Sequence, residues 1–259
     1  MIAPLQTKNL SVALGDVKAL QSVNVTILEH SFVGVLGPNG SGKSTLLRAL
    51  HRAVMTNGGT VLLDKHDIWS LHPTAVAQRI SVVAQEHHTG FAYTAHDVVM
   101  MGRSPYHAGM TRTTRADETI VATSLAQVGM SALAERDFDA MSGGERQRTL
   151  IARALAQQTD ILILDEPTNH LDIHYQLDIL RRVRALNLTT VAALHDLNLA
   201  ARWCDFIFVM HKGQIAAAGK PADVLTPSLI AEVFRVKATP YTHPELGILQ
   251  LAFDVLEES

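Results

Sequence analysis

The sequence predicts an α/β fold with a mostly parallel core sheet, an N-terminal antiparallel β-subdomain and an inserted α-helical subdomain. Three observations support this prediction. Short apolar runs of strand length alternate with helical segments on both sides of the middle of the chain. The N-terminal segment instead alternates apolar and polar side chains. Residues 85–159 show helical spacing throughout.

The N-terminal alternation predicts antiparallel strands with one solvated face, because side chains on a strand point to opposite faces in turn. Two runs carry it: Leu10, Val12 and Leu14, then Val23, Val25 and Ile27.

The remaining elements follow in chain order. We expect a strand over 32–36, a glycine-rich loop over 37–43, a helix over 44–54, a hairpin-like turn at 57–59, and strands over 60–63 and 80–84. After the helical segment come strands over 161–164, 190–194 and 206–210, with helices near 174–186 and 197–203. After Pro227 we expect a short helix, a proline-containing segment and a strand over 248–253. Strands that alternate with helices predict a covered, mostly parallel sheet.

These elements fit one domain in three parts. The core comprises residues 1–84 and 160–225, the helical subdomain 85–159, and a C-terminal extension 226–259.

Composition narrows the function classes. A formal net charge of −3 argues against a nucleic-acid binder that relies on a broad basic surface. The one cysteine, Cys204, precedes an apolar strand, so we expect a buried thiol. A single cysteine is also typical of a protein in a reducing compartment. No apolar run reaches the roughly 18 residues that span a bilayer, and no signal peptide is apparent. We therefore expect a soluble cytoplasmic chain whose membrane role, if any, needs a separate partner.

A phosphate-binding loop follows the strand over 32–36. The residues Gly37-Pro38-Asn39-Gly40-Ser41-Gly42-Lys43-Ser44 match the pattern G-x-x-x-x-G-K-[ST], and Thr45 continues the helix behind them. Glycines let successive N–H groups point at phosphate oxygens, and the helix start adds its positive dipole end. Lys43 is expected to pair with the β- and γ-phosphates of ATP, and the Ser44 hydroxyl to bind Mg²⁺.

Polar residues close two later strands. Asp165 ends an apolar run, where it is expected to support Mg²⁺ through water or from outside its direct ligands, because Mg²⁺ keeps several waters. Glu166 follows as the predicted general base or water-orienting group. His195 closes the strand over 190–194, and a neighbouring strand end would bring its imidazole near the γ-phosphate and Glu166.

Ser142-Gly143-Gly144-Glu145 opens a basic helix just ahead of the acidic strand. A P-loop, Gln85, this Ser-Gly-Gly run, the acidic pair, Asn169-His170-Leu171-Asp172 and His195 follow one another in the order of the ATP-binding cassette (ABC) ATPases. The chain resembles that family of P-loop NTPases over nearly its whole length. The resemblance implies an ATPase that uses ATP and Mg²⁺.

The resemblance also implies a split active site. In ABC ATPases two domains pair head to tail, and each ATP lies between one P-loop and the partner's Ser-Gly-Gly helix. Ser142 suits an N-cap, and the amides of Gly143 and Gly144 at a helix start can grip a γ-phosphate, with Glu145 next in the helix. Gln85 resembles the glutamine that senses Mg²⁺ and the attacking water and links to the transmembrane partner. Asp172 resembles the loop acid that contacts the opposite subunit.

Two positions depart from the family's usual pattern. Leu14 stands where an aromatic residue commonly stacks on adenine, so we expect ATP to bind with poor discrimination against GTP. Met141 and Glu145 replace the commoner leucine and glutamine around the Ser-Gly-Gly run.

One branch of the family matches best. The segments Met101-Gly102-Arg103-Ser104-Pro105 and Asn169-His170-Leu171-Asp172-Ile173 resemble the importers of iron chelates (siderophores), haem and cobalamin. In that branch the ATPase is usually a homodimer on the cytoplasmic face of the membrane, beneath a two-subunit permease with a binding protein outside. Histidines 87, 88, 96 and 107 match no zinc or iron spacing, and we expect them to face the permease.

Other functions stay open at this point. An importer of another metal-related solute is one. A non-transport ABC ATPase acting on ribosomes or DNA is another, although the chain has one cassette and no heptad run. A GTPase-type switch or small-molecule kinase would leave the Ser-Gly-Gly run unexplained, and the chain lacks an Asn-Lys-x-Asp base-reading motif.

Overall fold

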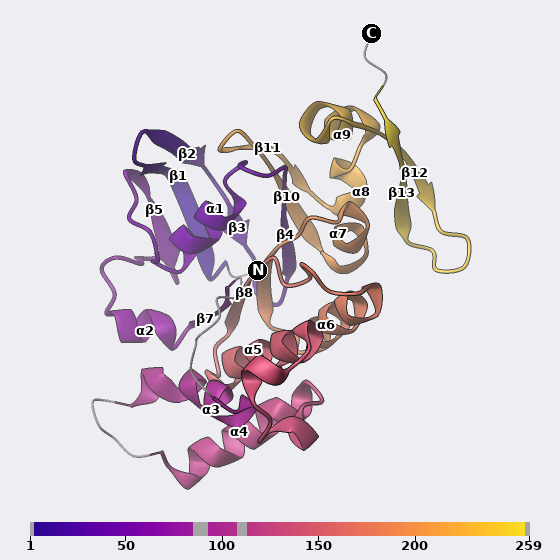
Figure 1. Cartoon of the computed structure of the whole chain (residues 1–259). Helices are drawn as coiled ribbons and strands as arrows, with labels where there is room; N and C mark the ends of the chain where they lie inside the picture. Colours follow the sequence, from indigo (N-terminus) through magenta and orange to yellow (C-terminus); the bar gives the residue numbers. More distant parts are fainter. Residues whose placement is uncertain (1–2, 85–92, 108–112, 257–259) are drawn as a thin grey trace. The chain divides into compact units, whose positions relative to one another are not determined.

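The computed structural model describes residues 3–84, 93–107 and 113–256. They form two compact units (Figure 1). Unit 1 comprises Met1–Ser70 and Asn187–Ser259, and unit 2 comprises Leu71–Leu186.

Unit 1 begins with an antiparallel sheet. Its strands are β1 (Leu5–Leu14), β2 (Val17–Val23), β3 (Thr26–Ile27), β5 (Gly58–Leu63) and β6 (His66–Asp67). They lie in the order β2-β1-β5-β6, with β3 also beside β1. The apolar residues of the predicted alternation are buried except Leu14, which is 47% exposed at the end of β1. The antiparallel β-subdomain is confirmed.

Unit 1 also contains parallel strands. Strand β4 (Phe32–Leu36) pairs in parallel with β9 (Thr189–Ala193) on one side and β10 (Phe206–His211) on the other, and β11 (Gln214–Gly219) pairs antiparallel with β10. All residues of β4 and β9 are buried, as expected for parallel strands covered on both faces. The helices of this unit are α1 (Lys43–Leu50), α7 (Leu197–Trp203), α8 (Pro221–Val224) and α9 (Pro227–Phe234). A hairpin of β12 (Val236–Thr242) and β13 (Leu249–Val255) ends it.

Unit 2 combines two parallel strands with helices. Strand β7 (Ile80–Val83) pairs with β8 (Ile161–Asp165), whose first four residues are fully buried. Its helices are α2 (Pro73–Ala77), α3 (Ala95–Met100), η1 (Met101–Tyr106), α4 (Arg115–Gln127), η2 (Ser131–Leu133), η3 (Phe138–Ala140), α5 (Gly143–Ala156) and α6 (Ile173–Ala185). The helices α3, α4 and α5 pack against one another. The predicted α/β class is therefore confirmed, with helices over most of the inserted segment.

The predicted hairpin turn at residues 57–59 is wrong. Gly58 and Gly59 belong to β5, and the Asn57 side chain accepts a hydrogen bond of 2.6 Å from the Ala13 N–H in β1. The asparagine thus fastens two strands of one sheet together instead of turning the chain. Strands β11 and β12 were not predicted at all.

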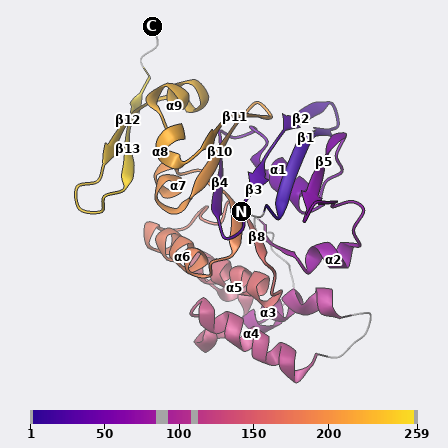
Figure 2. The same cartoon turned by 180° about the vertical axis from the view of Figure 1, so that it is seen from behind.

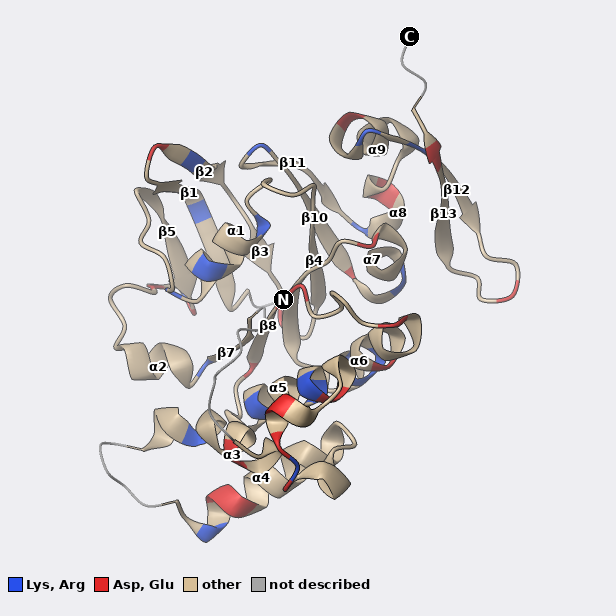
Figure 3. Ribbon diagram, in the orientation of Figure 1, with Lys and Arg blue, Asp and Glu red and all other residues tan. Residues whose placement is uncertain are grey.

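Acidic and basic residues are interspersed along both units (Figure 3). On α6, for example, Asp178 accepts hydrogen bonds of 2.7 Å from both Arg181 and Arg182. Within the described part of the chain, none of the helices combines the length and apolar character that a bilayer crossing requires.

Candidate functional site

The phosphate loop of unit 1 runs from the end of β4 to the start of α1. Gly37 and Gly42 adopt φ values of 147° and 106°, which other residues rarely adopt. A Cβ atom on Gly42 would lie 2.7 Å from the Ala19 carbonyl oxygen, and one on Gly37 would lie 2.4 Å from that of Met210. Only glycine fits at either position, so the loop stays a narrow backbone cradle.

Polar groups converge on that cradle. The Lys43 ammonium donates hydrogen bonds to the carbonyl oxygens of Gly37 (2.8 Å) and Pro38 (3.2 Å), and the residue is only 5% exposed. The hydroxyl of Ser41 is buried and has no hydrogen-bond partner among the described residues. Ser44 and Thr45 lie half-buried in the first turn of α1. A lysine, hydroxyl groups and a helix start together suit a phosphate chain.

His195 lies at the same sheet edge as this loop. Strands β4 and β9 run in parallel with Val35 opposite Ala193, and the Leu194 N–H donates to the Val35 carbonyl at 3.1 Å. Both strands therefore end at the same edge of the sheet. Gly37 follows β4 at this edge, and the exposed His195 lies just beyond the end of β9. Within unit 1, His195 therefore lies at the same sheet edge as the phosphate loop, and its predicted approach to Glu166 stays a prediction.

The acidic pair of unit 2 lies at the end of β8. Asp165 is its half-buried last residue, and Glu166 takes a positive φ of 54°, which turns the chain out of the strand. The Glu166 carboxylate accepts a hydrogen bond from the Asn169 side-chain amide, and the Asn169 N–H donates to the Glu166 carbonyl at 3.2 Å. Asn169 therefore contacts Glu166 through both its side chain and its backbone. This contact of Asn169 was not predicted, although Asn169 stands only three residues after Glu166.

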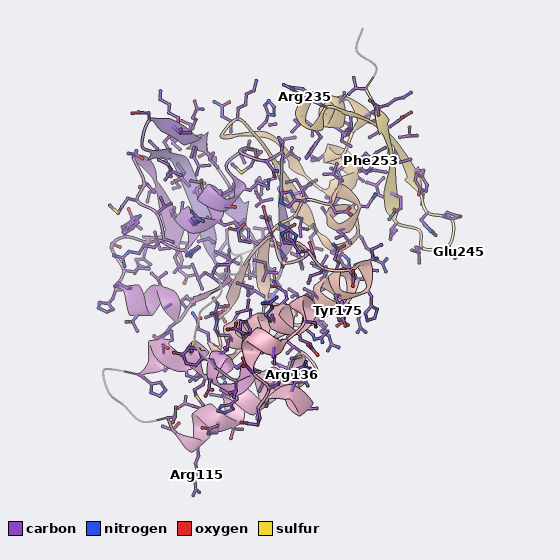
Figure 4. The ribbon with its side chains drawn as sticks, in the orientation of Figure 1. Arg115, Arg136, Tyr175, Arg235, Glu245 and Phe253 are labelled. Carbon is purple, nitrogen blue, oxygen red and sulfur yellow. The ribbon has the colours of Figure 1, made fainter. Side chains whose placement is uncertain are left out.

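The Ser-Gly-Gly run of unit 2 opens α5 with a capping box. The Ser142 hydroxyl accepts from the Glu145 N–H at 3.4 Å, and the Glu145 carboxylate accepts from the Ser142 N–H at 2.8 Å. Hydrogen bonds from the Ser142 backbone and hydroxyl lower the pKa of the Glu145 carboxyl. Arg136, in the loop before η3, lies 3.4 Å from that carboxylate (Figure 4). This helix start is therefore held in one conformation, as predicted for an N-cap serine.

The second glycine of the run contacts α6 closely. A Cβ atom on Gly144 would lie 2.7 Å from the Tyr175 ring, which is labelled on α6 in Figure 4. The Arg148 guanidinium lies 5.3 Å from the centroid of the same ring. A Cβ on Gly143 would meet only Leu171, at an ordinary 3.4 Å. Gly144 thus permits tight packing between α5 and α6.

The structure does not describe every residue predicted for the site and its surroundings. Gln85, His87 and His88 lie outside the described residues. His96 Nε2 lies 2.8 Å from the Glu118 carboxylate, and His107 Nε2 lies 3.4 Å from that of Asp117. Among the residues that the structure describes, no three His, Cys, Asp or Glu side chains are grouped as a metal site would require.

Unit 2 contains a buried ion pair that was not predicted from the sequence. Arg103 and Asp117 are 6% and 4% exposed and are joined by a hydrogen bond of 2.9 Å from Arg103 Nε. The Arg103 guanidinium also donates to the Ala156 carbonyl, at 2.7 Å, in the last residue of α5. Hydrogen bonds from the Thr114 hydroxyl and from Arg103 hold the pKa of Asp117 well below its usual range. No spacing rule joins these residues, so no local pattern predicts the pair.

Comparison with known proteins places these features in a family. The ABC transporter family profile matches residues 20–169. The cobalamin import ATP-binding protein BtuD of Halobacterium salinarum is 41% identical over 247 residues, covering 94% of this chain; the chain spans 62% of that relative's length. The petrobactin import ATP-binding protein FpuD of Bacillus anthracis is 39% identical over 94% of this chain and 90% of its own.

Among solved structures, a metal-chelate type ABC transporter in an inward-facing conformation superimposes with a TM-score of 0.86 at 26% identity, covering 98% of both chains. The profile, the relatives and the solved structure indicate the same family. The chain belongs to the ABC transporter family.

Proposed function

We propose that the chain is the ATP-hydrolysing subunit of an ABC importer that takes up an iron chelate, haem or cobalamin through a separate permease. The observation that carries the proposal is the combination of a glycine-built P-loop in unit 1 with a capped Ser-Gly-Gly helix start in unit 2. The similarity to BtuD and FpuD supports the choice of solutes.

ATP and Mg²⁺ fit the residues present. The cradle of residues 37–42 offers backbone N–H groups and the buried Ser41 hydroxyl, and Lys43 adds a cation beside them. Ser44, Asp165 and Gln85 would hold Mg²⁺, because hydroxyl, carboxylate and amide oxygens are the ligands it prefers. The bound ion would neutralise charge on the phosphates.

Hydrolysis would use Glu166 and His195. A water oxygen attacks the γ-phosphorus, the bond to the β–γ bridging oxygen breaks, and ADP leaves with that oxygen. The water gives its proton to the Glu166 carboxylate, which accepts a hydrogen bond from the Asn169 side chain. The His195 imidazole would donate a hydrogen bond to the γ-phosphate.

The chain would act with partners. A second copy would pair head to tail, so that Ser142, Gly143 and Gly144 grip the γ-phosphate of the partner's ATP and Glu145 holds the cap. Exposure of Ser142 at the start of α5 and of Asp172 at the start of α6 supports such contacts. The pair would sit on the cytoplasmic face of the membrane beneath permease subunits, with a binding protein outside.

Replacement of Glu166 tests the chemistry. We expect Glu166→Gln to bind ATP normally and hydrolyse it about 10²- to 10⁴-fold more slowly, because a positioned general base contributes that much. Steady-state hydrolysis and nucleotide affinity are measured beside Glu232→Gln on α9 as a control. An unimpaired Glu166→Gln chain would remove Glu166 as the catalytic group.

Reconstitution tests the transport role. The chain is combined with its permease in vesicles, and ATP-dependent uptake of a ferric siderophore, haem and cobalamin is compared. Hydrolysis stimulated by ribosomes or DNA instead of the permease would contradict the importer.

A further inference from the structure

The C-terminal hairpin packs against the rest of unit 1 through few buried residues. Ala238 in β12 and Leu251 in β13 are each 4% exposed, and every other described residue of the two strands is half-buried or exposed. Strand β12 contacts α9 and strand β13 contacts α7, as both views show (Figures 1 and 2). Figure 4 marks the hairpin by Phe253 on β13 and Glu245 in its loop.

One polar side chain joins this hairpin to α7. Asn198 Oδ1 accepts from the Leu251 N–H at 2.7 Å, and Asn198 Nδ2 donates to the Leu251 carbonyl at 3.2 Å. Across the hairpin Leu251 lies opposite Pro240. The carboxamide of Asn198 therefore satisfies both main-chain groups of Leu251, as a neighbouring strand would.

The same asparagine is bonded to the turn that follows His195. Its backbone N–H donates to Asp196 Oδ1 at 2.7 Å, and the Leu199 N–H donates to the same oxygen at 3.0 Å. Asp196 is the N-cap of α7 and directly follows His195. A continuous set of hydrogen bonds thus runs from Leu251 through Asn198 to the residue next to His195.

Burial of α7 does not require this asparagine. Leu197, Leu199 and Ala200 are at most 8% exposed and hold the helix by apolar packing, whereas Asn198 is half-buried on the side of the hairpin. Apolar contacts keep α7 and the hairpin together but tolerate small rotations of the helix. Hydrogen bonds are directional, so a pair of them to Leu251 restricts the angle between the helix and the hairpin. Asn198 therefore adds a directional contact between the start of α7 and the hairpin.

We propose that Asn198 is a positioning residue for His195: it ties the start of α7 to the C-terminal hairpin and so orients the imidazole. The inference rests on the proposed function, since it gives His195 a part in ATP hydrolysis. It assigns the C-terminal hairpin a role in the rate of that reaction.

The test uses the full-length chain and the variants Asn198→Ala, Asn198→Asp, His195→Ala and the double variant of His195→Ala with Asn198→Ala. Asn198→Ala is expected to lower kcat about tenfold, which corresponds to about 1.4 kcal/mol, and to leave KM for ATP unchanged. Asn198→Asp keeps the acceptor for the Leu251 N–H and should lose less. Arg202→Ala, an exposed position on the same helix, is the control.

The double variant separates positioning from a general structural effect. If Asn198 acts through His195, Asn198→Ala lowers kcat in the wild-type background and has no further effect in the His195→Ala background. An equal reduction in both backgrounds, or an unchanged kcat in Asn198→Ala, overturns the inference while His195 keeps its role. A His195→Ala chain with full activity removes the proposed role of His195 itself, and the inference falls with it. If Asn198→Ala does not fold, the same comparison with Asn198→Asp decides.

Discussion

At the scale of single residues, we expect Leu14 to determine how well the site distinguishes the bases of nucleotides. Its side chain is 47% exposed at the end of β1 and offers no aromatic face. We expect Leu14→Tyr to strengthen ATP binding by about 1–3 kcal/mol, the contribution of one base–aromatic stack. Competition between ATP and GTP measures this, with Val17→Tyr on the facing position of β2 as the control. Strong ATP selectivity in the unmodified chain would contradict the prediction.

The carboxylate of Asp117 is buried against Arg103 and forms an ion pair with it. Asp117→Asn leaves the arginine charge without its partner, so we expect the free energy of unfolding at pH 7 to fall by about 3–5 kcal/mol. Asp97→Asn is the matched control, because Asp97 closes the same kind of capping box at an exposed position. That variant should lose only about 0.5–2 kcal/mol.

The Asp117 pair also predicts a pH dependence. The pKa of the carboxyl is lower in the folded chain than in the unfolded chain, so ionisation favours folding. This stabilisation is complete above the unfolded pKa of about 4 and is lost as the pH falls through the folded value. Urea denaturation between pH 7 and pH 3 should therefore show a smaller decline for Asp117→Asn. An equally steep decline in that variant would show that other groups cause it.

At the scale of elements, the contact between α5 and α6 depends on Gly144. Gly144→Ala places a Cβ 2.7 Å from the Tyr175 ring, so we expect the free energy of unfolding to fall by about 1–3 kcal/mol. Gly143→Ala meets Leu171 at 3.4 Å and should change it by less than about 0.5 kcal/mol. Chemical denaturation compares the two. Combining Gly144→Ala with Tyr175→Ala should cost less than the sum of the single changes, and simple additivity would contradict the steric explanation.

Elements with marked ends were predictable from the sequence. Strand β4 lies between polar Ser31 and the P-loop glycine, and α7 between its cap Asp196 and Cys204; both have the predicted bounds. The burial that defines β4 is continuous, so its apolar run is unambiguous.

Elements whose signals conflict were not predictable. Pro240 argues against a strand, yet β12 is an edge strand of a two-stranded hairpin, where a proline is tolerated at a position whose N–H would not pair with the other strand. Asn57 and Gly58 are typical of a turn, but the asparagine side chain binds β1. Contacts such as that of Asn198 with Leu251 join positions 53 apart, and no local pattern encodes them.

At the scale of the whole molecule, the functional groups are divided between the two units. The P-loop and His195 belong to unit 1, whereas Asp165, Glu166 and Ser142 belong to unit 2. The roles of the P-loop, Asp165, Glu166 and His195 were predicted from a motif and from strand ends, whereas the role of Ser142 was predicted only from the resemblance to the family. Order alone does not say whether Ser142 serves the ATP of its own chain or that of a second copy.

Concentration dependence distinguishes those two possibilities. If Ser142 acts on the ATP of a second copy, the hydrolysing species is a pair, and specific activity falls as the chain is diluted. Ser142→Arg should then bind ATP with unchanged affinity, because its P-loop is intact, and hydrolyse it at a small fraction of the normal rate. Ser131→Arg, at an exposed serine of η2, is the control. A specific activity independent of dilution, or full hydrolysis by Ser142→Arg, would mean that each chain completes its own site.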